Sequence, residues 1–146
     1  MPDYVHLLDE LAPANGLSSV MIYRDCRDVA SSHLKLARTT WHNQGWIRRQ
    51  DTAEKVAKLW VDALESMERH RDRIHIIRYE DLVREPGREL TALAEWLGVD
   101  PAGFPERSMK SVRDDGIGKH RDELSEQDLE AVMDIAAPTM ARLGYV

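Results

Sequence analysis

Apolar positions along the chain fall into two short continuous runs and several stretches with helical spacing. Residues 18–23 are almost entirely apolar in the middle, as is typical of a buried parallel strand, and residues 73–78 predict a second strand. Between them, residues 51–70 carry apolar side chains every three to four positions, and Asp51 or Thr52 can cap the resulting amphipathic helix. A strand, a helix and a strand in this order predict a right-handed crossover in a parallel sheet.

The other periodic stretches predict shorter helices bounded by turn residues. They cover residues 4–12, 28–37, 86–97 and a last segment after Ser125. Asp28 is the expected cap of the helix that it opens, whereas Pro86 begins and Gly98 ends the next one. Pro138 should kink or split the last helix.

Two long stretches lack a regular pattern and are predicted to be loops. They are residues 38–50, which are rich in Trp, His, Asn, Gln and Arg, and residues 99–124. The predicted strands are few, since sheets commonly contain about four to six. The pattern therefore favours a helix-rich α/β fold with a small parallel sheet, in a single domain over residues 1–146.

Composition and charge narrow the class of protein. The 146 residues suffice for one buried core, and no apolar run approaches the roughly 20 residues that cross a bilayer. The N-terminus shows no basic stretch followed by an apolar one, and Cys26 is the single cysteine, as suits a reducing compartment. A net charge of −6 argues against general nucleic-acid binding. We therefore expect a cytoplasmic protein without membrane or nucleic-acid partners.

The most informative chemistry lies where the first strand ends. Arg24 follows the strand, and Ser32 comes eight residues later in the first turns of the next helix. The carboxyl edge of a parallel sheet is where α/β folds bind ligands, and a guanidinium with a hydroxyl near a helix start suits a phosphate. As alternatives, Arg24 forms a surface ion pair with Asp25 or Asp28, and the Ser32 hydroxyl bonds to its own backbone.

The segment over residues 23–32, Tyr-Arg-Asp-Cys-Arg-Asp-Val-Ala-Ser-Ser, resembles the 3′-phosphate-binding motif of sulfotransferases that use 3′-phosphoadenosine 5′-phosphosulfate (PAPS). In that family a strand leads into Arg-Asp-Pro-Arg-Asp-Val, and a Ser follows the first Arg by eight positions, whereas Cys26 stands here where Pro is usual. The resemblance implies that Arg24 and Ser32 bind the 3′-phosphate. It also implies a partial sulfotransferase fold of the P-loop-NTPase-like kind.

Later segments resemble the same family in order and spacing. Residues 78–86 are similar to the family's Tyr-Glu-Asp-Leu segment at the end of a strand, which implies an adenine contact for Tyr79. Residues 116–125 resemble the late loop that closes over the 3′-phosphate, although Lys119 and His120 replace the Arg and Trp of many bacterial members. The binding residues that the resemblance implies are Arg24, Ser32, Tyr79, Arg113, Gly118 and Lys119. A packing role for Tyr79 and a solvated late loop are the alternatives.

One part of the family pattern has no counterpart in the sequence. Family members hold the 5′-phosphosulfate on a loop of the type Pro-Lys-Ser-Gly-Thr-Thr, and no such loop precedes a helix here. The resemblance thus implies the C-terminal portion of a sulfotransferase domain, as a natural or engineered half or through a wrongly assigned start codon. We expect this chain to bind the 3′-phosphoadenosine part of PAPS, or adenosine 3′,5′-bisphosphate, and to lack transfer activity by itself. The complete enzyme would pass a sulfuryl group to a hydroxyl or amine of a small-molecule, glycan or peptide acceptor.

Candidates for a general base are few. Animal-type family members place a His-Leu segment before the Arg strand, and the local counterpart makes His6 the candidate catalytic residue, with Glu10 as a second. A histidine on an amphipathic helix is the plainer interpretation of His6. No histidine has zinc-ligand spacing, so no metal is implied. The arginines beside Cys26 favour a lowered thiol pKa, but no partner cysteine is present.

Two other classes of function stay open at this stage. One is a non-catalytic interaction or scaffold domain derived from the sulfotransferase fold, and the other is a helical protein whose motif similarity is fortuitous. A small sheet without neighbouring strands exposes an apolar edge, so we also expect a homodimer that covers it.

Overall fold

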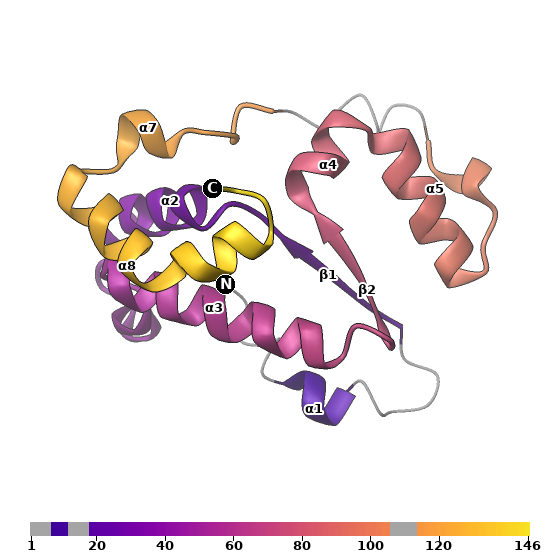
Figure 1. Ribbon diagram of the computed structural model, residues 1–146, viewed down its shortest axis with the longest axis horizontal. Helices are drawn as coiled ribbons and strands as arrows, with labels where there is room; N and C mark the ends of the chain where they lie inside the picture. The colour runs from indigo at the N-terminus through magenta and orange to yellow at the C-terminus, as the bar shows by residue number, and fades with distance from the viewer. Residues whose placement is uncertain (1–6, 12–17, 106–113) are drawn as a thin grey trace. The chain divides into compact units, whose positions relative to one another are not determined.

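The computed structural model of the chain describes residues 7–11, 18–105 and 114–146, and Figure 1 follows them along the sequence. Its elements are, in order, α1 (Leu8–Leu11), β1 (Ser19–Tyr23), α2 (Cys26–Arg38), the 3-10 helix η2 (Gly45–Arg49), α3 (Ala53–Arg69), β2 (Ile74–Arg78), α4 (Tyr79–Arg84), α5 (Pro86–Leu97), the 3-10 helix η3 (Pro101–Gly103), α7 (His120–Glu123) and α8 (Glu126–Arg142). Among the described residues the fold is therefore helix-rich α/β with a small parallel sheet, as the sequence predicts.

The chain divides into two compact units, each built from separate stretches of sequence. The first comprises Asp25–Glu65 and Ile117–Val146, and the second comprises the described residues of Pro2–Arg24 and Ser66–Gly116. The boundary falls within α3, so this helix contributes most of its length to the first unit and its last turn to the second.

The second unit holds the sheet, in which β1 and β2 run parallel. Ser19 lies opposite Ile74 at one end of the ladder, and Tyr23 lies opposite Arg78 at the other. Parallel neighbours need a long connection, and α3 lies within the stretch that joins β1 to β2. The predicted parallel pairing of the two strands is confirmed, and the right-handed sense of the crossover stays a prediction.

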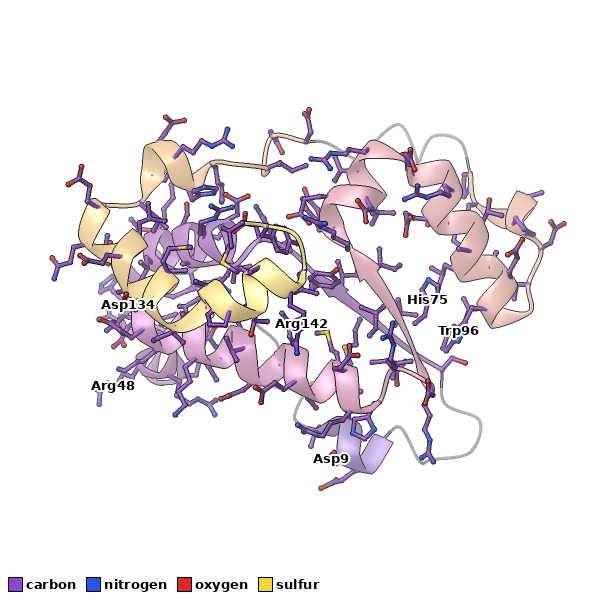
Figure 2. The ribbon with its side chains drawn as sticks, viewed as in Figure 1. Asp9, Arg48, His75, Trp96, Asp134 and Arg142 are labelled. Atoms are coloured by element: carbon purple, nitrogen blue, oxygen red, sulfur yellow. The ribbon has the colours of Figure 1, made fainter. Side chains whose placement is uncertain are left out.

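β1 is more exposed than its apolar sequence predicts. Val20 is 38% and Ile22 53% exposed, so the expectation of a fully buried strand is wrong. β2 is better covered because α5 packs against it, and Figure 2 shows Trp96 of α5 beside His75 of β2, with ring centroids 5.5 Å apart. The helix shields its own neighbouring strand and leaves one face of β1 open.

The first unit is built from helices around a shared apolar core. α2 packs against both α7 and α8. The buried side chains from its three long helices include Val29, Ala30 and Leu34 of α2, Val56, Ala57 and Trp60 of α3, and Val132, Ala136 and Met140 of α8. Their spacing of three and four residues matches the amphipathic pattern of the sequence, so burial of these faces accounts for the helices.

The helix ends agree with the sequence except at α2. Asp25, rather than the predicted Asp28, caps α2, because its side chain accepts a hydrogen bond from the Arg27 amide. Gly98 ends α5 with φ of 69°, in the left-handed region that glycine adopts without strain, and Ser125 caps α8 through the amide of Asp128. α8 runs through Pro138 as one assigned helix, so the proline does not split it.

Several short elements lie where the sequence predicts loops or predicts no regular element. η2 lies within the predicted loop 38–50, and η3 and α7 lie within 99–124. α4 was also missed, and it begins at the residue that follows β2. Elements of three to six residues are too short to show a 3.6-residue repeat, which explains why the hydrophobic pattern does not reveal them.

Two expectations concern the N-terminal region and membranes. Of the helix predicted over residues 4–12, the structure describes Leu8–Leu11 as helical, while residues 4–6 and 12 lie outside the described part. Among the helices that the structure describes, none is long and apolar enough to span a bilayer.

Candidate functional site

Arg24 and Tyr79 come together in the second unit at the carboxyl ends of the paired strands. Tyr23 and Arg78 lie opposite each other as the last residues of β1 and β2, so Arg24 and Tyr79 are the residues that follow the two strands. The guanidinium carbon of Arg24 lies 5.0 Å from the centroid of the Tyr79 ring. This is a cation–π distance, at which the ring attracts the charge. The pair thus offers a cation and an aromatic face at one sheet edge.

Gly116 completes this cluster from the late segment of the chain. The Nη2 atom of Arg24 donates a hydrogen bond to the carbonyl oxygen of Gly116. A Cβ atom at position 116 would lie 3.4 Å from both Arg24 Nη2 and the Tyr79 hydroxyl. These are van der Waals distances, so the late segment packs directly against both groups. We call Arg24, Tyr79 and Gly116 the arginine–tyrosine cluster.

Ser32 and Lys119 meet in the first unit. The Nζ atom of Lys119 donates a hydrogen bond to the Ser32 hydroxyl at 2.5 Å and lies 3.9 Å from a carboxylate oxygen of Glu123. The Lys119 side chain is 24% exposed, so its charge is partly shielded from water but still accessible. We call Ser32 and Lys119 the serine–lysine pair. An ammonium beside a hydroxyl is suited to bind an anion.

Asp28 anchors the segment that carries Lys119. Its carboxylate accepts hydrogen bonds from the amide of Gly118 at 2.7 Å, the amide of His120 at 3.0 Å and His120 Nδ1 at 2.7 Å. Burial raises the pKa of Asp28, but these hydrogen bonds outweigh burial and hold the pKa below its ordinary value. An ionised carboxylate can only accept, so Nδ1 of His120 carries the proton in this bond.

A second contact joins α7 to α2. The Ser31 hydroxyl donates to Oε2 of Glu123, and Nζ of Lys35 donates to its Oε1 at 3.0 Å. The hydrogen bond from Ser31 lowers the pKa of Glu123 most, and the hydrogen bond from Lys35 lowers it further. The carboxylate is solvent-accessible, so this contact contributes less than the buried bonds to Asp28.

Cys26 does not have the low thiol pKa that its arginine neighbours predict. The thiol is buried at the start of α2, with no exposed area. Burial raises the pKa of Cys26, and the neighbouring Asp25 raises it further, which outweighs the Arg27 guanidinium. The predicted lowering of its pKa is therefore wrong, because desolvation disfavours the thiolate more than the arginine favours it.

Comparison with models of known protein families matches residues 4–103 to the sulfotransferase family. The chain belongs to the sulfotransferase family. The match covers more than half of the chain. It therefore excludes the alternative of a helical protein whose motif similarity is fortuitous. No curated protein and no solved structure matches this sulfotransferase-family chain.

The structure brings the expected site residues of the sulfotransferase-family chain into two groups. Arg24 contacts Tyr79 in the second unit, while Ser32 contacts Lys119, next to Gly118, in the first. The family match includes the first three of these residues and ends before the late segment, so Lys119 and Gly118 rest on the contacts described above. The candidate base His6 and the candidate anion ligand Arg113 lie outside the described residues.

Sequence reasoning missed three residues that the structure places in contact with these candidate residues or with their segment. Asp28 was interpreted as a helix cap, and neither His120 nor Gly116 was given a role. The replacement of the family's usual Trp by His120 was the available signal, because a histidine beside a basic residue needs a hydrogen-bond partner when buried. In the described ranges, no group of three or more His, Cys, Asp or Glu side chains is placed to hold a metal ion.

Proposed function

We propose that this sulfotransferase-family chain binds the 3′-phosphoadenosine part of PAPS. We further propose that, together with a phosphosulfate-binding loop of the family type, it serves transfer of a sulfuryl group to a hydroxyl or amine. The observation that carries the proposal is the serine–lysine pair. It places the ammonium of Lys119 against the hydroxyl of Ser32, and Ser32 lies on a helix whose sequence resembles the family's 3′-phosphate motif.

The chemistry of the serine–lysine pair fits a phosphate. A phosphate monoester carries close to two negative charges at neutral pH and accepts several hydrogen bonds. Lys119 would supply the compensating charge, and Ser32 would donate its hydroxyl proton once Lys119 turns toward the anion. The partial exposure of Lys119 leaves room for this exchange of partners.

The arginine–tyrosine cluster supports the nucleoside part of the proposal. One face of the Tyr79 ring interacts with the Arg24 guanidinium, and an aromatic ring of this kind is a stacking surface for a base. The guanidinium fork of Arg24 suits bidentate binding of a phosphate. The family resemblance assigns adenine to Tyr79 and the 3′-phosphate to Arg24, and both assignments are part of the proposal.

Transfer itself needs a group that stabilises the leaving phosphate. In the related phosphoryl transfers, positioning and charge stabilisation supply most of the rate. The sequence contains no loop of the Lys-Ser-Gly-Thr kind, so transfer is proposed only where such a loop is supplied with this chain. Binding, in contrast, is proposed for this chain by itself.

The test compares two nucleotides that differ by the 3′-phosphate. We expect calorimetric titration to give tighter binding of adenosine 3′,5′-bisphosphate than of adenosine 5′-phosphate. Lys119→Gln should lower the affinity for the bisphosphate by about tenfold, equivalent to roughly 1.4 kcal/mol, and leave the affinity for the monophosphate unchanged. Lys35→Gln is the matched control, since Lys35 is an exposed lysine of α2 that bonds to Glu123.

Two results would contradict the proposal. One is the absence of heat with the bisphosphate, which would favour a scaffold domain derived from the fold. The other is an equal loss of affinity in the Lys119 and Lys35 variants, which would mean that any nearby positive charge attracts the nucleotide.

A further inference from the structure

Asp28 places its carboxylate under the segment on both sides of Lys119. Gly118 and His120, the residues immediately before and after the lysine, donate three hydrogen bonds to this carboxylate. The carboxylate is 1% exposed and the His120 side chain 7%, so these bonds are shielded from water. A backbone fixed at positions 118 and 120 leaves the intervening Lys119 little freedom except in its side chain.

Capping does not explain the position of Asp28. The cap of α2 is Asp25, whose side chain already accepts a hydrogen bond from the Arg27 amide. Asp28 is the third residue of the helix, and the hydrogen bonds described above join it to a segment about ninety positions away in the sequence. Burying a carboxylate costs free energy unless hydrogen bonds compensate, and here the compensation comes from the segment that carries Lys119.

The backbone conformation of Gly118 fits the same contact. Its φ of 77° lies in the left-handed region, where a residue with a side chain would be strained. This turn lets the amide of Gly118 and the amide of His120 donate to the same carboxylate. The geometry therefore needs both a glycine and an ionised acceptor.

We propose that Asp28 is a positioning residue that holds Lys119 against Ser32 and so sets the affinity of the serine–lysine pair for a phosphate. The inference rests on the proposed function, since it specifies how this same pair is prepared for its ligand. Asp28 acts through the backbone on either side of Lys119, and it leaves the lysine charge free to bind the anion.

The first measurement needs no nucleotide. Hydrogen–deuterium exchange of the folded chain should show faster exchange in the segment 114–124 for Asp28→Asn than for the original protein. Asp128→Asn is the matched control, because Asp128 is also a partly buried carboxylate, with a 3.0 Å ion pair to Arg38, but it lies on α8. Unchanged exchange at 114–124 in Asp28→Asn would overturn the positioning role.

The second measurement is a double-mutant cycle on the affinity for adenosine 3′,5′-bisphosphate. Asp28→Asn should lower this affinity by about tenfold in the original protein. In the Lys119→Gln background the same change should lower it by less than about twofold, because the group that Asp28 positions is gone. Affinity for adenosine 5′-phosphate should stay unchanged. A full tenfold loss in both backgrounds would overturn the inference.

Two further arms keep the outcomes distinct. If the original protein does not prefer the bisphosphate, the proposed function fails, and the exchange result still decides whether Asp28 holds the segment. If Asp28→Asn does not fold, His120→Ala replaces it, since this change removes one side-chain bond and keeps both backbone bonds. His120→Ala should then give a two- to threefold loss that disappears in the Lys119→Gln background, and an undiminished loss would overturn the inference.

Discussion

At the residue scale, Arg24 combines two interactions that no sequence spacing could reveal together. It faces the ring of Tyr79 and donates to the Gly116 carbonyl oxygen, so three segments distant in sequence converge on one side chain. Because Arg24 follows a strand, the sequence predicts that it binds a phosphate. Its contact with Tyr79 depends on the register of β1 and β2, and its contact with Gly116 depends on the path of the late segment.

We expect Arg24→Ala to abolish measurable binding of adenosine 3′,5′-bisphosphate, because it removes both a cation and the partner of the Tyr79 ring. Arg24→Lys should recover only part of the affinity, since a lysine keeps the charge but loses the planar fork. Titration calorimetry measures both. Arg84→Ala, on an exposed arginine of α4, is the control, and an equal effect there would refute a specific role for Arg24.

His33 gives a second residue-scale prediction, concerning pH. Burial lowers the pKa of His33 to about 4, although a hydrogen bond with Gln50 raises it. The unfolded chain takes up this proton near pH 6.5 while the folded chain does not, so stability falls as pH drops from about 6.5 toward 4.

Urea unfolding at pH 7 and pH 5 should show this loss of stability. His33→Gln should reduce the difference between the two pH values, because glutamine does not titrate. The same difference in the variant and in the original protein would show that other groups cause the pH dependence.

At the scale of elements, the sequence predicted what hydrophobic period and capping residues determine. β1, β2, α3, α5 and α8 lie where expected, because each carries a strong repeat or a cap. The short α7 was missed because its place depends on bonds from His120 to Asp28, on another helix. For the same reason the contact between Ser32 and Lys119 was not predicted, and the family resemblance implied only that each residue binds the nucleotide.

The end of α5 allows a prediction with an internal control. Gly98→Ala should destabilise the protein by about 1 kcal/mol, because a side chain is strained at φ of 69° while no neighbour lies within 4 Å of the added Cβ. Gly87→Ala, within the same helix and equally uncrowded, should stabilise by about 0.5–1 kcal/mol. Thermal unfolding measures both. Changes of the same sign would contradict the assigned helix end.

At the scale of the whole molecule, the apolar surface of the second unit is the feature to explain. Its large exposed hydrophobic side chains include Val20, Ile22, Trp96, Leu97 and Val99. Leu97 of α5 is 39% exposed. β1 has no charged residue or proline to discourage strand pairing, and among the described strands only β2 pairs with it.

We therefore expect a homodimer in which two copies of β1 come together. Light scattering should give twice the chain mass at micromolar concentration, and Ile22→Lys should shift the equilibrium to the monomer. Ile135→Lys is the control, since Ile135 is an exposed isoleucine of α8 in the first unit. A monomer at all concentrations would refute the dimer. The single-domain organisation also stays a prediction, which one cooperative unfolding transition would support.

The buried thiol of Cys26 makes the first turn of α2 observable without any mutation. It is the single cysteine of the chain and has no exposed area, and it lies two residues from both Arg24 and Asp28. A thiol reagent can modify it only when this turn opens, so the labelling rate reports transient opening beside the proposed site. A nucleotide that binds the closed turn should slow this reaction in proportion to its occupancy, which would turn the cysteine into a built-in sensor of ligand binding.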